Sequence, residues 1–407
     1  MSTKLKITVI SSSLAILLFT IVGGLVNVRA SSNDGAYRQL SVYSEVLSRI
    51  RLEYVEEPNI TSVTEGALHG LLESLDANSS YLSPEEYKQY KALKDGRAAI
   101  GADVSKRFGY AAVVAVIPGG PADKAGIDNS DIIESIEGKS THDMSLAEIR
   151  SLLSGAPGST INVAVVRPRR LEPQKVVITR DIVTIPAVTE KMLADNVGYI
   201  KLDAFPQGKS EEIASKIRDL QKQGAEKLVL DLRNCAGGEE AEGIATANLF
   251  LDHGTITYLQ GQKYPRQSFN ADPAKDITKL PVAVLVNRGT AGPAEIVAAA
   301  ILENARGDVI GDKTFGDGSV QKLIEMPDNS ALILSIAKYY SPSGKAIQDA
   351  AVTPNIMVAD ASDDEGALPD DEDQPAPDVK KDQKPKNQPD DQLNKALEVL
   401  KNRDSKA

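Results

Sequence analysis

The chain has 407 residues, of which 42% are hydrophobic, and a formal net charge of −11 at pH 7. This length allows two or three domains, the composition is that of a globular protein, and the acidic balance argues against nucleic-acid binding. The sequence contains no zinc-type Cys/His spacing and no Walker or dinucleotide glycine motif, so no metal and no cofactor is expected. Cys235, the single cysteine, cannot form an intrachain disulfide.

The amino terminus indicates a membrane segment. Lys4 and Lys6 precede an uncharged run from Ile7 to Val28, which as a helix spans about 33 Å, enough to cross a bilayer. The run is longer than a usual signal-peptide core, although a possible cleavage site follows it. Residues 1–35 are therefore predicted to be an anchor or a signal peptide, and we favour an uncleaved, single-pass inner-membrane anchor. The positive-inside rule predicts that the bulk of the chain is periplasmic or otherwise extracytoplasmic.

Two regions follow the anchor. Residues 36–95 are predicted to be helical, and Ser83, followed by a proline and two glutamates, is a typical helix start. Residues 96–181 instead combine short β-rich runs with one amphipathic helix, predicted over Ser145–Ser154. The strands expected in this second region are Ala111–Ile117, Asp131–Ile136 and Ile161–Arg167.

Residues 182–360 alternate apolar runs of strand length with helical patterns. Such alternation predicts an α/β core with buried parallel strands. The expected strands are Val197–Leu202, Lys227–Leu232, Val282–Val286 and Ala331–Tyr339, and the expected helices are Glu211–Gln223, Ala241–Leu251 and Ala294–Leu302.

The carboxyl-terminal region divides in two. Residues 361–389 are acidic and then basic, which predicts a disordered linker. Residues 390–407 can form a short helix with four apolar residues on one face. This helix could fray in solvent or could dock on a partner or on the core of its own chain. The apolar residues are Leu393, Ala396, Leu397 and Leu400.

Several segments in chain order resemble motifs of the C-terminal processing peptidases, also called tail-specific proteases, from about residue 40 to residue 358. The resemblance implies a mixed α/β protein with a helical N-terminal region, an inserted PDZ domain and a ClpP/crotonase-like core that carries a serine/lysine dyad. The segments are Leu75–Ser83, Ala125–Asp131, Leu230–Gly238, Asn287–Ile296, Thr314–Gln321, Tyr339–Gln348 and Thr353–Ile356.

Two of these segments lack the residues that the family uses for chemistry. The family reads N-x-x-S-A-S-A-x-E-I over Asn287–Ile296, which puts Gly292 at the serine nucleophile. It reads T-F-G-K-G-x-V-Q over Thr314–Gln321, which puts Asp317 at the lysine base. A hydroxyl needs a base within hydrogen-bond reach, and a lysine serves when burial leaves its amine neutral. Neither group is present at these positions.

The resemblance also assigns the supporting residues. Gly237 and Gly238 correspond to the glycine loop that supplies oxyanion-hole amides, and Gln321 corresponds to the glutamine that orients the lysine. The residue after the nucleophile gives the other oxyanion N–H, but here it is Pro293, which has none. Losing one such donor lowers the rate on the order of 100-fold to 1000-fold.

Neighbouring groups could replace the lost ones. Thr290 and Ser319 carry hydroxyls, although ordinary loop roles explain both. Lys313 lies four residues before Asp317, roughly 13 Å away in extended chain, which is too far for a base without rebuilding the loop. Cys235 is a conceivable nucleophile, but no histidine is an obvious partner, and a buried thiol is the simpler interpretation.

The PDZ resemblance implies a peptide-binding groove. Its loop amides hold a terminal carboxylate, and the peptide adds a strand to the sheet edge. The leucines and isoleucine of the amphipathic helix could equally be core residues. In the turn that follows Gly126, Asn129 or Ser130 must replace the family's glycine. The implied peptide-binding residues are Ile100, Gly101, Ala102, Leu146, Ile149 and Leu153.

Three functions remain in competition. The leading hypothesis is a pseudopeptidase that binds protein C-terminal tails, or pairs with an active homologue or a second copy and regulates it. The second is an active serine-type endopeptidase with displaced catalytic residues, such as Thr290 and Lys313. The third is an assembly subunit that acts through its C-terminal helix.

Overall fold

The computed structural model describes residues 34–92, 98–167, 170–348, 350–359 and 390–404. The described residues fall into two compact units, which divide after Leu68. The first contains α2 (Asp34–Glu53) and most of α3 (Ile60–Glu73). Among the described residues, no helix has the length and apolar character to span a bilayer. The uncharged run of the predicted anchor or signal peptide, residues 7–28, lies outside the described part of the chain.

The segment before the PDZ domain is helical only in part. Helix α4 (Pro84–Ala92) begins where the sequence predicts, since the Ser83 hydroxyl accepts from the Glu86 N–H at 3.4 Å and the Glu86 carboxylate accepts from the Ser83 N–H at 2.7 Å. The prediction that residues 36–95 are helical was wrong at β1 (Ser80–Leu82), a short strand just before the predicted helix start at Ser83, which pairs antiparallel with β18 (Ala331–Tyr340). A pairing so distant in sequence leaves no local signal.

The predicted PDZ domain folds as an antiparallel sheet with a helix packed on it. Four of the buried positions of its core are Ile100 and the inward face of α6, namely Leu146, Ile149 and Leu153. Ser130 has φ +70°, so it makes the turn that a glycine makes in the family. The sheet order is β3-β4-β5-β8-β9. Its elements are β2 (Ala98–Ala99), β3 (Ala102–Arg107), β4 (Tyr110–Val116), α5 (Pro121–Lys124), β5 (Ile132–Ile136), β6 (Lys139–Ser140), α6 (Leu146–Leu153), β7 (Ser154–Gly155), β8 (Thr160–Arg167) and β9 (Arg170–Thr179).

The core domain is built on a six-stranded sheet in the order β10-β11-β12-β15-β16-β19, in which only β10 runs antiparallel to its neighbour. The α/β prediction is therefore confirmed. The strands are β10 (Thr189–Met192), β11 (Val197–Lys201), β12 (Lys227–Asp231), β15 (Val282–Val286), β16 (Gly307–Gly311) and β19 (Ile356–Met357), and the helices are α7 (Lys209–Lys222), α8 (Glu240–Asn248), α9 (Pro293–Glu303) and α10 (Asp391–Asp404).

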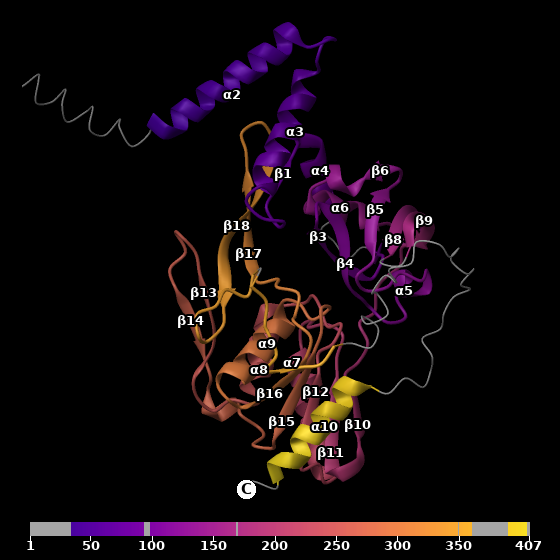
Figure 1. Ribbon diagram of the computed structural model, residues 1–407, viewed down its shortest axis with the longest axis vertical. Coiled ribbons are helices and arrows are strands. Elements are labelled where there is room, and N and C mark those ends of the chain that lie inside the picture. The colour runs from indigo at the N-terminus through magenta and orange to yellow at the C-terminus, as the bar shows by residue number, and fades with distance from the viewer. Residues whose placement is uncertain (1–33, 93–97, 168–169, 349, 360–389, 405–407) are drawn as a thin grey trace, which may run out of the picture. The chain divides into compact units, whose positions relative to one another are not determined.

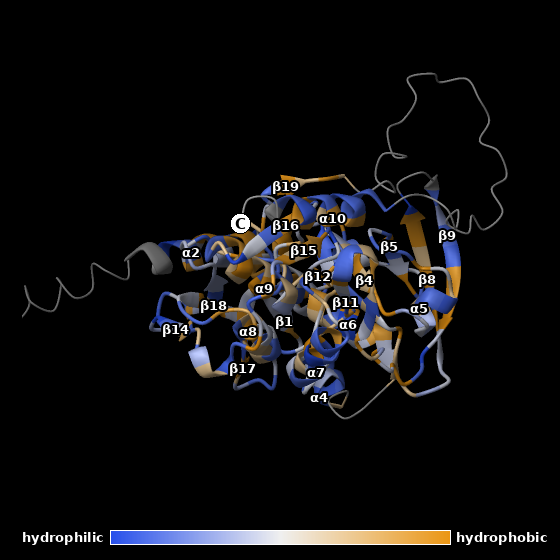
Figure 2. Ribbon diagram, turned by 90° about the horizontal axis from the view of Figure 1, so that it is seen from below, coloured by the Kyte–Doolittle hydropathy of each residue, from blue (hydrophilic) through white to orange (hydrophobic). Residues whose placement is uncertain are grey.

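Helices cover both faces of this sheet (Figure 1). Because side chains alternate along a strand, Leu228 and Leu230 of β12 face α7, α8 and α9, whereas Val229 faces α10. Figure 2 shows hydrophilic residues along α7 and hydrophobic ones around α9, which is enclosed. Helix α10 buries Ala396 and Leu400 against the sheet of its own chain.

A second sheet extends from the core in the order β1-β18-β13-β14, and β17 also pairs with β18. Its remaining strands are β13 (Thr255–Gln260), β14 (Gln267–Asn270) and β17 (Ser319–Glu325), and short 3-10 turns lie at Thr141–Asp143, Ala194–Asn196 and Pro273–Lys275. The turn before β17 contains Asp317, so this sheet helps to position the candidate site.

Candidate active site

Gly292 is the residue that precedes α9. Its backbone has φ +62° and ψ −121°, a conformation that residues with a side chain rarely adopt. A β-carbon placed at Gly292 would nevertheless meet no atom within 4 Å. The turn therefore leaves open space where the family carries its nucleophile, and Gly292 supplies no group to fill it.

Glu295 joins the two motifs and was not singled out by the sequence. It is fully buried on the first turn of α9, where one carboxylate oxygen accepts the N–H groups of Gly292 at 3.1 Å and Asp317 at 2.8 Å. The other oxygen accepts the Gly316 N–H at 2.8 Å and the Thr314 hydroxyl. Burial raises the pKa of Glu295 to about 8, against the effect of these hydrogen bonds. Glu295 thus fixes the backbone at both dyad positions.

The Asp317 side chain lies in a cluster of polar residues. Its carboxylate accepts from the Asn78 side-chain amide at 3.3 Å. Burial raises the pKa of Asp317, Arg150 opposes this shift, and Asp103 adds to it. Arg150 of α6 lies 3.8 Å from Asp103 of the neighbouring strand β3. The base position of the family is therefore occupied by an acidic group with amide and guanidinium neighbours.

Gln321, which corresponds to the family's lysine-orienting glutamine, forms hydrogen bonds with serines instead. Its side-chain amide donates to the Ser319 hydroxyl at 2.7 Å and lies 3.4 Å from the Ser335 hydroxyl. The Asn78 amide also donates to Ser319, at 3.0 Å. The Ser319 oxygen therefore accepts two hydrogen bonds within a network that ties β17 to the segment before β1.

The glycine loop retains the geometry that only glycine permits. Gly238 has φ +108°, and a β-carbon there would lie 2.2 Å from the Phe205 carbonyl oxygen. Gly237 has φ +75°, and a carboxylate oxygen of Asp103 would lie 3.5 Å from a β-carbon at this position. A small apolar cluster seats β4 of the PDZ domain on the site loops. Its buried residues are Val114, Ala115, Ala236 and Ala291.

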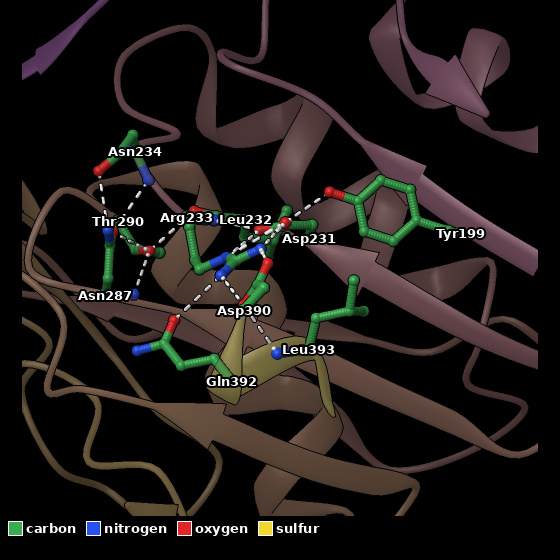
Figure 3. Close-up of polar contacts among 10 residues, drawn as sticks. All are labelled: Tyr199, Asp231, Leu232, Arg233, Asn234, Asn287, Thr290, Asp390, Gln392 and Leu393. Carbon is green, nitrogen blue, oxygen red and sulfur yellow. Dashed lines mark hydrogen bonds and ion pairs between the residues drawn. The ribbon is translucent and has the colours of Figure 1, made fainter. Parts of the chain in front are cut away.

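The start of the glycine loop is tied to α10 (Figure 3). The fully buried Asp231 accepts from the Tyr199 hydroxyl at 2.7 Å and from the Arg233 guanidinium at 2.6 Å. Arg233 also donates to both carboxylate oxygens of Asp390, at 2.8 and 2.9 Å, and to Gln392 at 3.3 Å. The guanidinium therefore connects the end of β12 to the first turn of the C-terminal helix.

Thr290 uses its hydroxyl within the same loops. The side chain is fully buried, donates to the Leu232 carbonyl at 2.7 Å and accepts from the Asn287 N–H at 3.0 Å. Asn287 in turn donates to Asn234 at 2.8 Å, as Figure 3 shows. The Thr290 hydroxyl is thus committed to holding two loops together.

The other replacement groups have equally ordinary surroundings. Cys235 is fully buried, and burial raises the pKa of its thiol well above the usual value, which keeps it protonated. The side chain of Lys313 is exposed to solvent. Cys235 therefore lacks the environment of a thiolate nucleophile, and Lys313 lacks the buried setting of a lysine base.

The residues predicted to bind peptide lie in two settings. Leu146, Ile149 and Leu153 are buried in the PDZ core. Leu146 also lines a cavity of about 310 Å³, together with Arg150, Asn78 and Gln321. The cavity therefore lies between α6 and the polar cluster around Asp317. Peptide binding by Ile100, Gly101 and Ala102 stays a prediction.

The fold and site define a PDZ-containing scaffold of the serine-type peptidase class. A family model for peptidase family S41 matches residues 196–358, and a model for the PDZ domain matches residues 113–167. The chain belongs to the C-terminal processing peptidase family, because it is 33% identical over 338 residues to the carboxy-terminal-processing protease of Bartonella bacilliformis, covering 82% of this chain and 78% of that protein.

Two further relatives agree with this assignment. The carboxy-terminal processing protease CtpA of Bacillus subtilis is 31% identical, with 81% of this chain and 70% of that protein covered. Among solved structures, the photosystem II D1 C-terminal processing protease superposes with a TM-score of 0.66 at 28% identity, covering 77% of this chain and 86% of that chain.

Proposed function

We propose that this chain is a pseudopeptidase that binds the C-terminal tails of other proteins through its PDZ domain, on the extracytoplasmic side of the inner membrane. The observation that carries the proposal is that Gly292 and Asp317 occupy the two dyad positions. Open space at Gly292 and an acidic, amide-bonded group at Asp317 support it. A glycine cannot attack a carbonyl, and an aspartate is no substitute in kind for a buried neutral amine.

The surroundings of the other candidates also support inactivity. Thr290 is buried with its hydroxyl in two hydrogen bonds, and Ser319 accepts from two amides. A displaced catalytic pair would have to break these bonds before it could act. The burial of α10 on its own core removes the observation that motivated an assembly role for that helix.

The test separates binding from cleavage. A fluorescein-labelled dodecapeptide with a free terminal carboxylate and its amidated twin are each titrated with the full chain, and the peptides are then examined by mass spectrometry. We expect the free-carboxylate peptide to bind more tightly, because loop amides hold its carboxylate, and to remain intact. Equal binding of the twins would overturn tail recognition, and turnover by the unmodified chain would overturn inactivity.

A further inference from the structure

A groove of about 490 Å³ runs along one side of α8. Ala241, Ile244, Ala245 and Asn248 line it, whereas Gly243 packs against Pro293 at the start of α9. At 100° per residue, Gly243 lies on the opposite side of the helix from the lining residues. Helix α8 therefore separates the groove from Gly292 by the width of one helix.

The other wall of the groove is the sheet that ends at β14. Phe269 of β14 and Tyr339 of β18 line it, with their ring centroids 6.5 Å apart. The β14 strand pairs with β13 along one edge only, and within the described residues it is the last strand of its sheet. The groove thus opens beside a strand edge whose backbone N–H and C=O groups are available to a further strand.

Charged side chains lie at both ends of the groove. Glu240, directly before Ala241, adds to the burial that raises the pKa of Tyr339 to about 12, and it also acts on the carboxyl of Asp317. This end of the groove therefore carries a negative charge. At the other end Lys275 and Asp272 are both exposed and both line the groove, and the Asp272 carboxylate accepts the Ala274 N–H at 3.0 Å.

We propose that this groove binds an extended polypeptide segment that adds a strand to the free edge of β14. The segment places an apolar side chain between Ile244 and Phe269 and sets an acidic side chain against Lys275. From Ala241 to Asn248 the helix rises about 10 Å, which an extended chain covers in about three residues.

Two features favour a polypeptide over a small apolar molecule. Only a polypeptide offers alternating donors and acceptors to the β14 edge, and the acidic side chain complements the Lys275 charge at the end remote from Glu240. The site is distinct from the PDZ groove, and it depends neither on a free terminal carboxylate nor on the loss of peptidase activity. The proposed function and this inference can therefore fail separately.

The probe is an amidated nonapeptide with an N-terminal fluorescein, Ser-Thr-Leu-Thr-Leu-Ser-Glu-Thr-Ser, titrated with the full chain by fluorescence anisotropy. The amide prevents capture by the PDZ loop through a terminal carboxylate. We expect saturable binding, and slower amide hydrogen exchange over Gln267–Asn270 at saturation. Replacing both leucines of the probe by serine should weaken binding tenfold or more.

Matched variants locate the site on the chain. Ala241→Arg fills the groove from an exposed position and should weaken binding at least tenfold, whereas Ala274→Arg, on the neighbouring 3-10 turn but outside the groove lining, should leave binding unchanged. Lys275→Glu should weaken binding of the probe and restore it for a probe in which lysine replaces the glutamate.

Several outcomes would overturn the proposal. They are no binding up to about 1 mM, unchanged exchange over Gln267–Asn270 at saturation, equal affinity of the serine probe, and insensitivity to Ala241→Arg. Self-association of the chain through β14 that excludes the probe would assign the edge to a second copy and would also refute it.

Discussion

The structure predicts that position 292 tolerates a small side chain better than position 238 does. Gly292 and Gly238 both have positive φ, so alanine strains the backbone at each. They differ in space, because a β-carbon at Gly292 meets nothing within 4 Å, whereas one at Gly238 lies 2.2 Å from the Phe205 carbonyl oxygen. Comparison of Gly292→Ala with Gly238→Ala therefore distinguishes the cost of backbone strain alone from the cost of strain combined with a steric clash.

The magnitudes follow from these contacts. At Gly292 the strain is about 1–3 kcal/mol, and the lower chain entropy of unfolded alanine offsets about 0.4–1 kcal/mol of it, which leaves a net loss of about 1–2 kcal/mol. At Gly238 the backbone must move, which disturbs the hydrogen bonds from Phe205 to Gly237 and from Glu239 to Phe205. We expect a loss of about 4 kcal/mol or more there.

The assay is urea-induced unfolding followed by circular dichroism, with the free energy of unfolding of each variant compared with that of the unmodified chain. Gly292→Ala should shift the midpoint slightly, and Gly238→Ala should shift it far more or abolish folding. Equal destabilisation by the two substitutions would refute the inference that the nucleophile position remains open.

Three further predictions concern the surroundings of the site. Burial raises the pKa of Glu295 to about 8 in the folded chain, against an ordinary value of 4.5. Its contribution to stability is therefore full below about pH 4.5 and is lost as the pH rises to about 8. The free energy of unfolding should fall across this pH window, and it should fall less in the Glu295→Gln variant. Asp390→Asn removes the negative charge paired with Arg233 but keeps the side-chain oxygen that accepts the Leu393 N–H at the start of α10. It should therefore lower the free energy of unfolding by about 1 kcal/mol. The control substitution Asp391→Asn should have no such effect. Cys235 should resist a disulfide-exchange reagent such as DTNB in the native state and react on unfolding, since its buried thiol stays protonated; rapid native labelling would contradict its assigned burial.

The sequence predicted the elements that carry their own periodicity. The strand Val282–Val286 has the predicted bounds, and Pro293 begins α9 one residue before the predicted start at Ala294. The family resemblance is confirmed by the relatives, and it identified the loops that approach one another. These features could be predicted because they depend on local residue patterns or on the order of motifs, both of which can be read from one sequence.

Contacts between distant segments could not be read in the same way. The pairing of β1 with β18 and the hydrogen bonds of Asn78 to Asp317 and Ser319 join residues separated by more than two hundred positions. Glu295 was visible as a motif letter, but its four donors come from two loops that meet only in the folded chain. The docking of α10 on its own core could not be predicted either. The sequence shows that the helix has an apolar face, but it does not show whether that face packs on a partner or on the same chain.

The most direct test of inactivity is labelling of the intact chain by a fluorophosphonate probe that reacts with activated serine and threonine hydroxyls. We predict no labelling of the unmodified chain, because Gly292 has no hydroxyl and the hydroxyls of Thr290 and Ser319 are held in hydrogen-bond networks. The chain carrying Gly292→Ser and Asp317→Lys provides the matched comparison at the same positions. Stoichiometric labelling of the unmodified chain, abolished by Thr290→Ala or by Ser319→Ala, would contradict the account.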